Sequence, residues 1–256
     1  MMRIKIRSIL LCSILVILSF CSLSVAASVA VSGESALVMN QHSFTYDDLR
    51  EPVKYLMIVT SLSFIPALVI ASTSFTRIII VLSMLRSALG LQSSPPNAVM
   101  VLLALFLTIF SMSSVIDEIH GKAILPYLNN SIGLEEAVGF GATELKTFML
   151  SNTDEEVYIS LIDATKGTAP NELSDISYMH LVPAFMLTEI KTAFQMGFLI
   201  YIPFILIDLI VASILMGLGM IMVPPMTISM PIKILVFVLA DGWSLLSNSL
   251  ILSVSV

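Results

Sequence analysis

The ionisable side chains that stand out in this sequence lie in or beside long apolar runs, where such groups are rare. Seven of them are placed in this way: Arg77, Arg86, Glu189, Lys191, Asp208, Lys233 and Asp241. An ionisable group at membrane depth is costly, so it is usually paired or faces a wet interior. The chemistry that these residues indicate is ion pairing between helices, with ion or proton conduction as the alternative.

The spacing of Asp208 and Lys233 predicts one such pair. If the chain turns near Ile221, Asp208 lies thirteen residues before the turn and Lys233 lies twelve residues after it. In an antiparallel hairpin the two side chains would be level, so we predict an ion pair, either within one chain or between neighbouring subunits. A proton relay is the less favoured alternative, because no chain of further acids follows.

Two further spacings concern the remaining charges. Lys233 and Asp241 are eight residues apart, which predicts that they share one helix face. Glu189 and Lys191 are two residues apart, so we expect them to point to different faces of their helix.

No pattern of catalytic or metal-binding residues is present in the sequence. The three histidines make no metal spacing, and neither HExxH, GxSxG nor a phosphate-binding loop occurs. The acidic clusters Glu135-Glu136 and Asp154-Glu155-Glu156 could hold a cation, but they lack calcium-loop spacing, so a solvated helix face is the favoured interpretation. We therefore expect no enzyme, no cofactor and no metal site.

The most unusual stretch is Met216–Pro225, which reads MGLGMIMVPP. Five of the chain's 16 methionines lie between Met216 and Met230. Two glycines loosen the backbone here, and the closing pair of prolines stops any helix that reaches it. Methionine is flexible and polarisable, so an uncharged loop of this kind could close around objects of changing shape. Filling gaps between packed helices is the more usual role of methionine and is the alternative.

Composition places the chain among integral membrane proteins. Apolar residues make up 57% of the sequence and charged residues 12%, against roughly 25% charged residues in an average soluble domain. The mean hydropathy is +0.99. The net charge of −6 gives no basis for nucleic-acid binding, which requires a clustered basic surface.

The N-terminus has the pattern of a signal peptide. A basic start precedes an apolar core that is too short to span a membrane, and small residues follow it. We predict a signal peptide over residues 1–30 with cleavage after Ala27 or Ala30, and an uncleaved anchor is the alternative. Both cysteines, Cys12 and Cys21, lie inside this segment, so cleavage would leave a mature chain without thiol chemistry.

The first membrane hairpin is predicted over residues 55–116, after a polar periplasmic lead-in at 31–54. It contains charge-free runs at 55–76 and 98–116, each long enough to span a bilayer, and Pro66 should kink the first. Arg77 and Arg86 are the only cations between the two runs, which predicts a cytoplasmic loop there.

The polar middle and the second hairpin complete the predicted architecture. Residues 117–182 hold eleven acidic residues and three lysines, which favours the non-cytoplasmic side. The second hairpin covers 183–256, and its last span is predicted over 234–252. We therefore predict an all-α integral membrane protein with two long helical hairpins, four hydrophobic segments in all, and an acidic, mainly helical periplasmic domain between them.

Two long stretches of the chain resemble the FliP family of type III secretion export-gate proteins. The first is Phe64–Asn97, which contains TSFTRIIIV, and the second is Pro183–Trp243, which contains TEIKTAFQ and MVPP. Together with the signal peptide and the acidic middle, the resemblance covers nearly the whole chain. These strings are long enough to be specific.

The resemblance implies a core subunit of the flagellar export gate, a multi-pass protein of the bacterial inner membrane at the flagellar basal body. Five copies would form a closed, helically arranged pore with FliQ and FliR, and would contact FlhA and FlhB. Unfolded rod, hook and filament subunits would pass through this pore. The resemblance also implies that the hairpins are lifted towards the periplasm instead of lying as ordinary spans.

The resemblance also gives the methionine loop a role. The family's methionine-rich seal, which closes the pore at rest, corresponds to Met220, Ile221 and Met222, with Met216 beside it. The family often has methionine at all three positions, and Ile221 departs from that pattern. A β-branched residue there would make the seal stiffer.

Two alternatives remain open at this point. One is the homologous gate protein of a virulence injectisome, whose members generally lack a cleavable signal peptide and a long lead-in. The other is an ordinary four-span channel or transporter subunit, in which Asp208, Lys233 and Asp241 would lie on an ion path.

Overall fold

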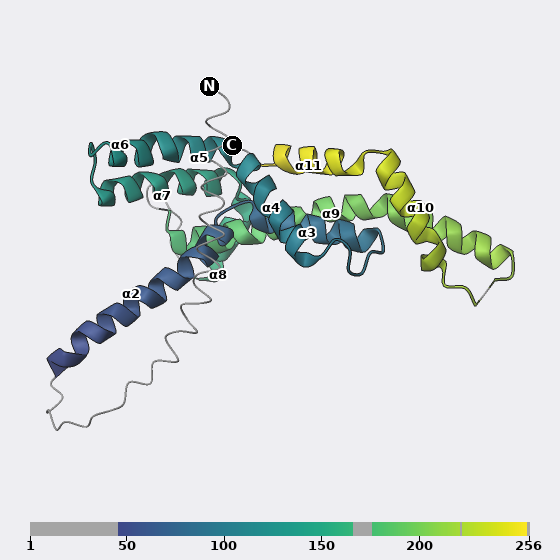
Figure 1. Ribbon diagram of the computed structural model, residues 1–256, viewed down its shortest axis with the longest axis horizontal. Coiled ribbons are helices and arrows are strands. Elements are labelled where there is room, and N and C mark those ends of the chain that lie inside the picture. Colours follow the sequence, from purple (N-terminus) through teal and green to yellow (C-terminus); the bar gives the residue numbers. More distant parts are fainter. Residues whose placement is uncertain (1–45, 166–175, 221, 255–256) are drawn as a thin grey trace. The chain divides into compact units, whose positions relative to one another are not determined.

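The computed structural model describes residues 46–165, 176–220 and 222–254, and across these residues all regular structure is helical. The predicted signal peptide, both cysteines, Ile221 and most of the lead-in lie outside the described residues. The chain divides into two units, Met1–Met57 and Ile58–Val256. The elements in chain order are α2 (Tyr46–Ala71), α3 (Phe75–Ala88), α4 (Asn97–Ser111), α5 (Ser113–Ile119), the π-helix η1 (His120–Ile124), α6 (Leu125–Leu128), α7 (Leu134–Ser151), α8 (Glu155–Ala164), α9 (Tyr178–Gly217), α10 (Pro225–Leu239) and α11 (Gly242–Leu252) (Figure 1).

Two helices are long and apolar enough to cross a membrane. They are α2, over Val53–Ala71, and α9. Two bent pairs bring the number to four if each pair is one span: α4 with the Ser113–Leu128 helix, bent by 64°, and α10 with α11, bent by 66°. The predicted all-α class is therefore confirmed for the described residues, whereas the layout as four spanning segments in two hairpins remains a prediction.

The longest element is α9, a single helix of 40 residues. It runs through both Pro183 and Pro203, although the sequence suggested a domain boundary at the first of these. At 1.5 Å per residue this helix is about 60 Å long, roughly twice the hydrocarbon thickness of a bilayer. Only part of α9 can therefore lie in a membrane, and the rest must extend beyond it.

The main core lies where α3 packs between α4 and α9. The α3 side chains that point into it recur at helical spacing and are fully or almost fully buried: Ile78, Val81, Leu82, Leu85 and Ala88. On the α9 side, Gly197 allows a close approach, because a Cβ atom added there would overlap the thioether of Met84. Helix α11 adds Leu246 and Leu250 to the same core.

A second core joins the acidic middle of the chain to the first half of α9. Phe148 of α7 and Phe185 of α9 meet edge to face, with ring centroids 5.8 Å apart, and Met112, Leu181 and Val254 pack around them. Because these aromatic rings are buried between helices, the 117–182 segment shares its hydrophobic core with both the start of α9 and the C-terminal end of the described chain. The acidic residues of this segment that the structure describes are exposed or half-buried and lie outside this core.

Two breaks in the helices differ from the sequence-based boundaries. The run predicted as one span over 98–116 contains a bend, because α4 stops at Ser111 and the chain turns by 64° at Met112, and the span itself stays a prediction. This bend turns Met112 and Val115 into the second core. Beyond it the chain remains helical as far as Leu128, past the predicted end at Asp117.

The second break separates α10 from α11. The last span was predicted to be unbroken, but Asp241 adopts the left-handed conformation at φ 48° and starts a new helix. Gly242 follows, and a Cβ atom there would overlap the ring of Phe237, so the chain can fold back tightly only with glycine. The prediction that Lys233 and Asp241 share one helix face is therefore wrong, since the helix ends between them.

Candidate functional site

The turn between α9 and α10 carries the methionines that the sequence singled out. The N–H of Gly219 donates to the carbonyl of Met216 (3.0 Å), and the N–H of Met220 donates to the carbonyl of Leu215 (2.9 Å). Gly219 has φ +74°, a left-handed conformation that glycine adopts without strain, and this pair of hydrogen bonds closes α9. Pro225 then occupies the start of α10, where no backbone N–H is needed.

The methionine side chains of this turn face outward from the chain. The exposed fractions are 65% for Met216, 40% for Met220 and 97% for Met222, and Ile221 lies outside the described residues. A methionine that is this exposed does not fill a gap within its own chain. The turn between α9 and α10 therefore presents an apolar surface that the rest of the described chain leaves uncovered.

A network of ion pairs and hydrogen bonds joins α9 to α10. The Lys233 Nζ atom donates to Asp208 Oδ2 at 2.6 Å, and the Ser229 hydroxyl donates to Asp208 Oδ1 at 2.6 Å. Both carboxylate oxygens of Asp208 therefore have a partner from α10. The pair predicted from the spacing about the turn is confirmed, and it forms within one chain.

The same lysine makes a third link, to α3. Its Nζ atom donates to the backbone carbonyl of Ala88 at 3.0 Å, and Lys233 as a whole is only 3% exposed. Ala88 is the last residue of α3. A cation at this position is favourable because the carbonyl groups at the C-terminal end of a helix carry partial negative charge.

A second buried ion pair lies further towards the start of α9. The guanidinium of Arg77 in α3 forms two hydrogen bonds with the carboxylate of Glu189. Its Nε atom donates to Oε2 at 2.9 Å, and its Nη2 atom donates to Oε1. The remaining nitrogen, Nη1, donates to the backbone carbonyl of Ser253 at 2.6 Å. Three segments that are far apart in the sequence therefore converge on one guanidinium.

The two arginines that predicted a cytoplasmic loop have different surroundings. Arg77 is buried within α3, where its charge is matched by Glu189 and not by solvent, and the cytoplasmic side of the α3–α4 turn stays a prediction. Arg86 does lie next to the α3–α4 turn, where it donates to the side chain of Asn97 (2.6 Å) and to the carbonyl of Pro95 (3.3 Å). These hydrogen bonds join the two ends of the α3–α4 turn.

Lys191 lies on a different face of α9 from Glu189, as its spacing predicts. Its Nζ atom donates to Asp154 Oδ2 at 2.7 Å, at the start of α8, and this pair is largely exposed. The Lys191 ammonium, together with the N–H of Glu156, lowers the pKa of Asp154 below its ordinary value. Asp154 also caps α8 by accepting that N–H at 3.1 Å.

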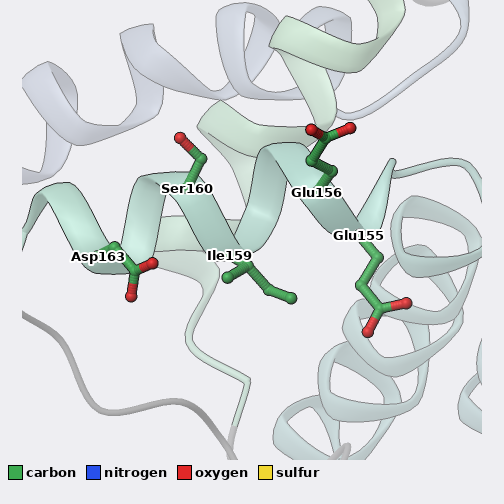
Figure 2. Close-up of a pocket in the computed structure, with 5 residues that line it drawn as sticks. All are labelled: Glu155, Glu156, Ile159, Ser160 and Asp163. Atoms are coloured by element: carbon green, nitrogen blue, oxygen red, sulfur yellow. The ribbon is translucent and has the colours of Figure 1, made fainter.

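The acidic cluster of α8 borders a hollow lined by Glu155, Glu156, Ile159, Ser160 and Asp163. Figure 2 shows that Glu156 and Ser160 point to one side of the helix, whereas Glu155 and Asp163 point to the other. Carboxylates that diverge in this way cannot close around one ion. Within the described ranges, no group of three or more His, Cys, Asp or Glu side chains is arranged to hold a metal.

Three members of these networks did not emerge from the sequence. Ser229 could have been found, because it lies four residues before Lys233 and so shares its helix face. The carbonyl groups of Ala88 and Ser253 had no sequence signal, since every residue carries a carbonyl group and only packing decides which one meets a charge.

Comparison of the sequence with known proteins finds one family over most of the chain. The family model described as the FliP family matches residues 58–250, which include both buried ion pairs and the methionine turn. A relative from Bacillus subtilis (strain 168), named Flagellar biosynthetic protein FliP, is 45% identical over 207 residues, covering 81% of this chain and 94% of the relative.

Two further relatives carry the same name. The protein from Pectobacterium carotovorum subsp. carotovorum is 48% identical over 201 residues, covering 77% of each chain. The protein from Aquifex aeolicus (strain VF5) is 44% identical over 209 residues, covering 80% of this chain and 87% of the relative. With a family model over most of its length and relatives this similar, the chain belongs to the FliP family of flagellar biosynthetic proteins.

Proposed function

We propose that this chain is a core pore-forming subunit of the flagellar type III export gate. In this role it passes unfolded rod, hook and filament subunits across the inner membrane. The support comes from membership of a flagellar biosynthetic family, from helices long and apolar enough to cross a membrane, and from the outward-facing methionine turn. As a transport component, the chain itself catalyses no reaction.

The single observation that carries the proposal is the exposure of Met216, Met220 and Met222. They lie at the end of the α9–α10 hairpin, whose two helices are joined by the ion pair of the buried Lys233. Exposed thioethers gain nothing within a lone chain, since no other part of that chain covers them. Several such turns arranged in a ring would cover one another. Because methionine has three flexible torsions, that ring can close completely and still yield to cargo of varied shape.

The proposed gate has several copies of this chain, five by the family's implied arrangement, together with FliQ and FliR, and it contacts FlhA and FlhB. An isolated chain leaves many large apolar side chains of α9 exposed, among them Phe194, Phe198, Leu199 and Leu206. Lipid or neighbouring subunits must cover such a surface. A protein that works only in an assembly has this property.

An ordinary four-span channel is less well supported. In that alternative Asp208, Lys233 and Asp241 would line one ion path. Lys233 is instead buried against Asp208 and Ala88, and Asp241 lies beyond the break that ends α10. The flagellar names of the relatives likewise favour the flagellar gate over the injectisome version.

Replacing Met220 and Met222 together by alanine tests the seal. We expect complexes to assemble at the normal level but to leak small ions, because alanine removes most of the thioether volume that closes the ring. The measurement is the ion permeability of membranes that contain assembled complexes. Met179→Ala is a matched control, since Met179 is 81% exposed at the start of α9, the end of that helix opposite to the methionine turn. Unchanged permeability in the assembled double variant would contradict the proposed seal.

The composition of the complex is a second, independent test. Native mass analysis of the detergent-extracted complex, co-expressed with its neighbouring genes, should give several copies of this chain with two other small membrane proteins. A monomer or a small homo-oligomer would instead support the channel alternative.

A further inference from the structure

The C-terminal end of α3 is closed by two backbone hydrogen bonds that leave one carbonyl free for another partner. Gly90, at φ +78°, donates its N–H to the carbonyl of Ser87 (3.0 Å), and Leu91 donates to the carbonyl of Arg86 (3.1 Å). This is the usual glycine-terminated helix end. The carbonyl of Ala88 accepts from Lys233 Nζ, which comes from α10, 145 residues further along the chain.

A second contact joins the same two places. Met230 lies three residues before Lys233, on the same face of α10, and its Cγ atom would lie 3.8 Å from a Cβ atom placed on Gly90. The backbone of the α3–α4 turn therefore faces α10 through both an apolar side chain and an ammonium group. The turn is itself held by the hydrogen bonds from Arg86 to Asn97 and Pro95.

Lys233 is thus shared between two acceptors on different elements. One is the carboxylate of Asp208 on α9, and the other is the carbonyl of Ala88 at the end of α3. The lysine is almost completely buried, so water cannot replace either acceptor at low cost. A displacement of the α3–α4 turn must then move α10 with it, or break the hydrogen bond to the ammonium.

We propose that Lys233 couples the α3–α4 turn to the methionine turn, and that this coupling sets the resting position of the methionines. The inference deepens the proposed gate function and rests on it. Lys233 acts here as a positioning residue: it touches no cargo, but its two acceptors fix α10, and α10 begins directly after the methionine turn. A force applied to the α3–α4 turn would reach Met220 and Met222 by this route.

The test reads the position of the methionine turn directly. Met222→Cys provides a thiol at the most exposed position of the turn, in a chain whose only two cysteines lie in the predicted signal peptide. The labelling rate of this thiol by a water-soluble maleimide is measured in the complete, assembled complex. The rate is compared among three chains that carry Met222→Cys: one with no other change, one with Gly90→Ala and one with Lys233→Met.

Gly90→Ala is the decisive variant, because it strains the backbone of the α3–α4 turn, while its methyl group makes only ordinary van der Waals contact with Met230 of α10, at 3.8 Å. A side chain at φ +78° is disfavoured, so the turn must shift. We expect the labelling rate at position 222 to change by about fivefold, the factor that corresponds to losing one typical hydrogen bond. Lys233→Met should change it at least as much, and combining the two should add little, since both act through one contact.

Gly139→Ala is the matched control, because Gly139 is a helical glycine of α7 with open space around its Cβ position. It should leave the labelling rate unchanged. If Gly90→Ala also leaves the rate unchanged, or if the effects of Gly90→Ala and Lys233→Met multiply, the coupling is wrong and Lys233 serves the ion pair alone.

The coupling and the gate function can fail separately. If Met220→Ala with Met222→Ala leaks ions while Gly90→Ala does not alter labelling, the gate stands and the coupling is overturned. If Gly90→Ala alters labelling while the methionine variants do not leak, the coupling stands as a structural property and the proposed seal is overturned.

Discussion

Two ion pairs that join α9 to other helices differ in how completely their side chains are buried. Each joins an acid of α9 to a cation from another helix. In the Arg77–Glu189 pair the side chains are 4% and 1% exposed, whereas in the Lys233–Asp208 pair they are 4% and 33% exposed. Nineteen residues separate the two acids, which places them about 28 Å apart along the helix.

The cations explain much of this difference. A guanidinium is planar and matches a carboxylate with two parallel hydrogen bonds, so Arg77 binds Glu189 and still has a nitrogen for the end of the described chain. An ammonium is a compact charge on a flexible stem, and Lys233 divides its donors between a carboxylate and a helix end. The Arg77–Glu189 pair is enclosed on all sides, whereas a displacement of the end of α3 would disturb the hydrogen bonds of Lys233.

The largest expected effect comes from breaking the closed pair. Glu189→Ala leaves the buried charge of Arg77 without a carboxylate and with only the oxygens of Ser253 as partners, and the loss of one member of a buried ion pair typically costs roughly 3–5 kcal/mol of folding free energy. We expect the variant chain to be strongly destabilised, measured as loss of folded protein in detergent on heating. Lys191→Ala, two residues away, removes only an exposed pair and should have a far smaller effect on stability.

A double replacement sharpens this prediction. Arg77→Met together with Glu189→Leu removes both charges and keeps the side-chain volume, so it should recover much of the stability that Glu189→Ala loses. If the double variant is as unstable as Glu189→Ala, the unpaired charge is not the cause, and the contact from Arg77 to Ser253 is the more important one.

A smaller effect is expected for the half-open pair. Asp208→Lys or Lys233→Asp alone should abolish assembly, because each places two like charges side by side. The double reversal restores the attraction between the helices but puts a carboxylate against the carbonyl of Ala88, so we expect partial recovery only. The amount of assembled complex after co-expression measures this. Full recovery would show that the carbonyl contact is unimportant, and no recovery would contradict the importance of the pair.

The smallest effect concerns the exposed pair of Asp154 and Lys191. Because the folded pKa of Asp154 is lowered, its contribution to stability is complete above the ordinary aspartate pKa of about 3.9 and is lost as the pH falls through the lowered value. The protection of α8 amides, taken as the exchange rate relative to the intrinsic rate at each pH, should thus be unaffected by this group between pH 7 and pH 5, and should fall only in stronger acid. Asp154→Asn is the control and should lack that acid-dependent step.

Local features of the sequence determined a good part of this structure. Mean hydropathy and apolar run length indicated long helices, and the two glycines with the proline pair placed the turn between α9 and α10. The Asp208–Lys233 pair followed from counting residues about that turn. These features could be predicted because each depends on one helix or one hairpin, where spacing along the chain fixes spacing in three dimensions.

Only the tertiary structure decided the contacts between distant elements. The sequence marked Arg77 as an embedded charge, but nothing in it pointed to Glu189, 112 residues away, as the partner, or to the carbonyl groups of Ala88 and Ser253. The continuity of α9 through two prolines and the break at Asp241 likewise went against the local pattern. Burial is the physical reason: a charge enclosed among helices must find a partner wherever packing offers one, and packing depends on the whole chain.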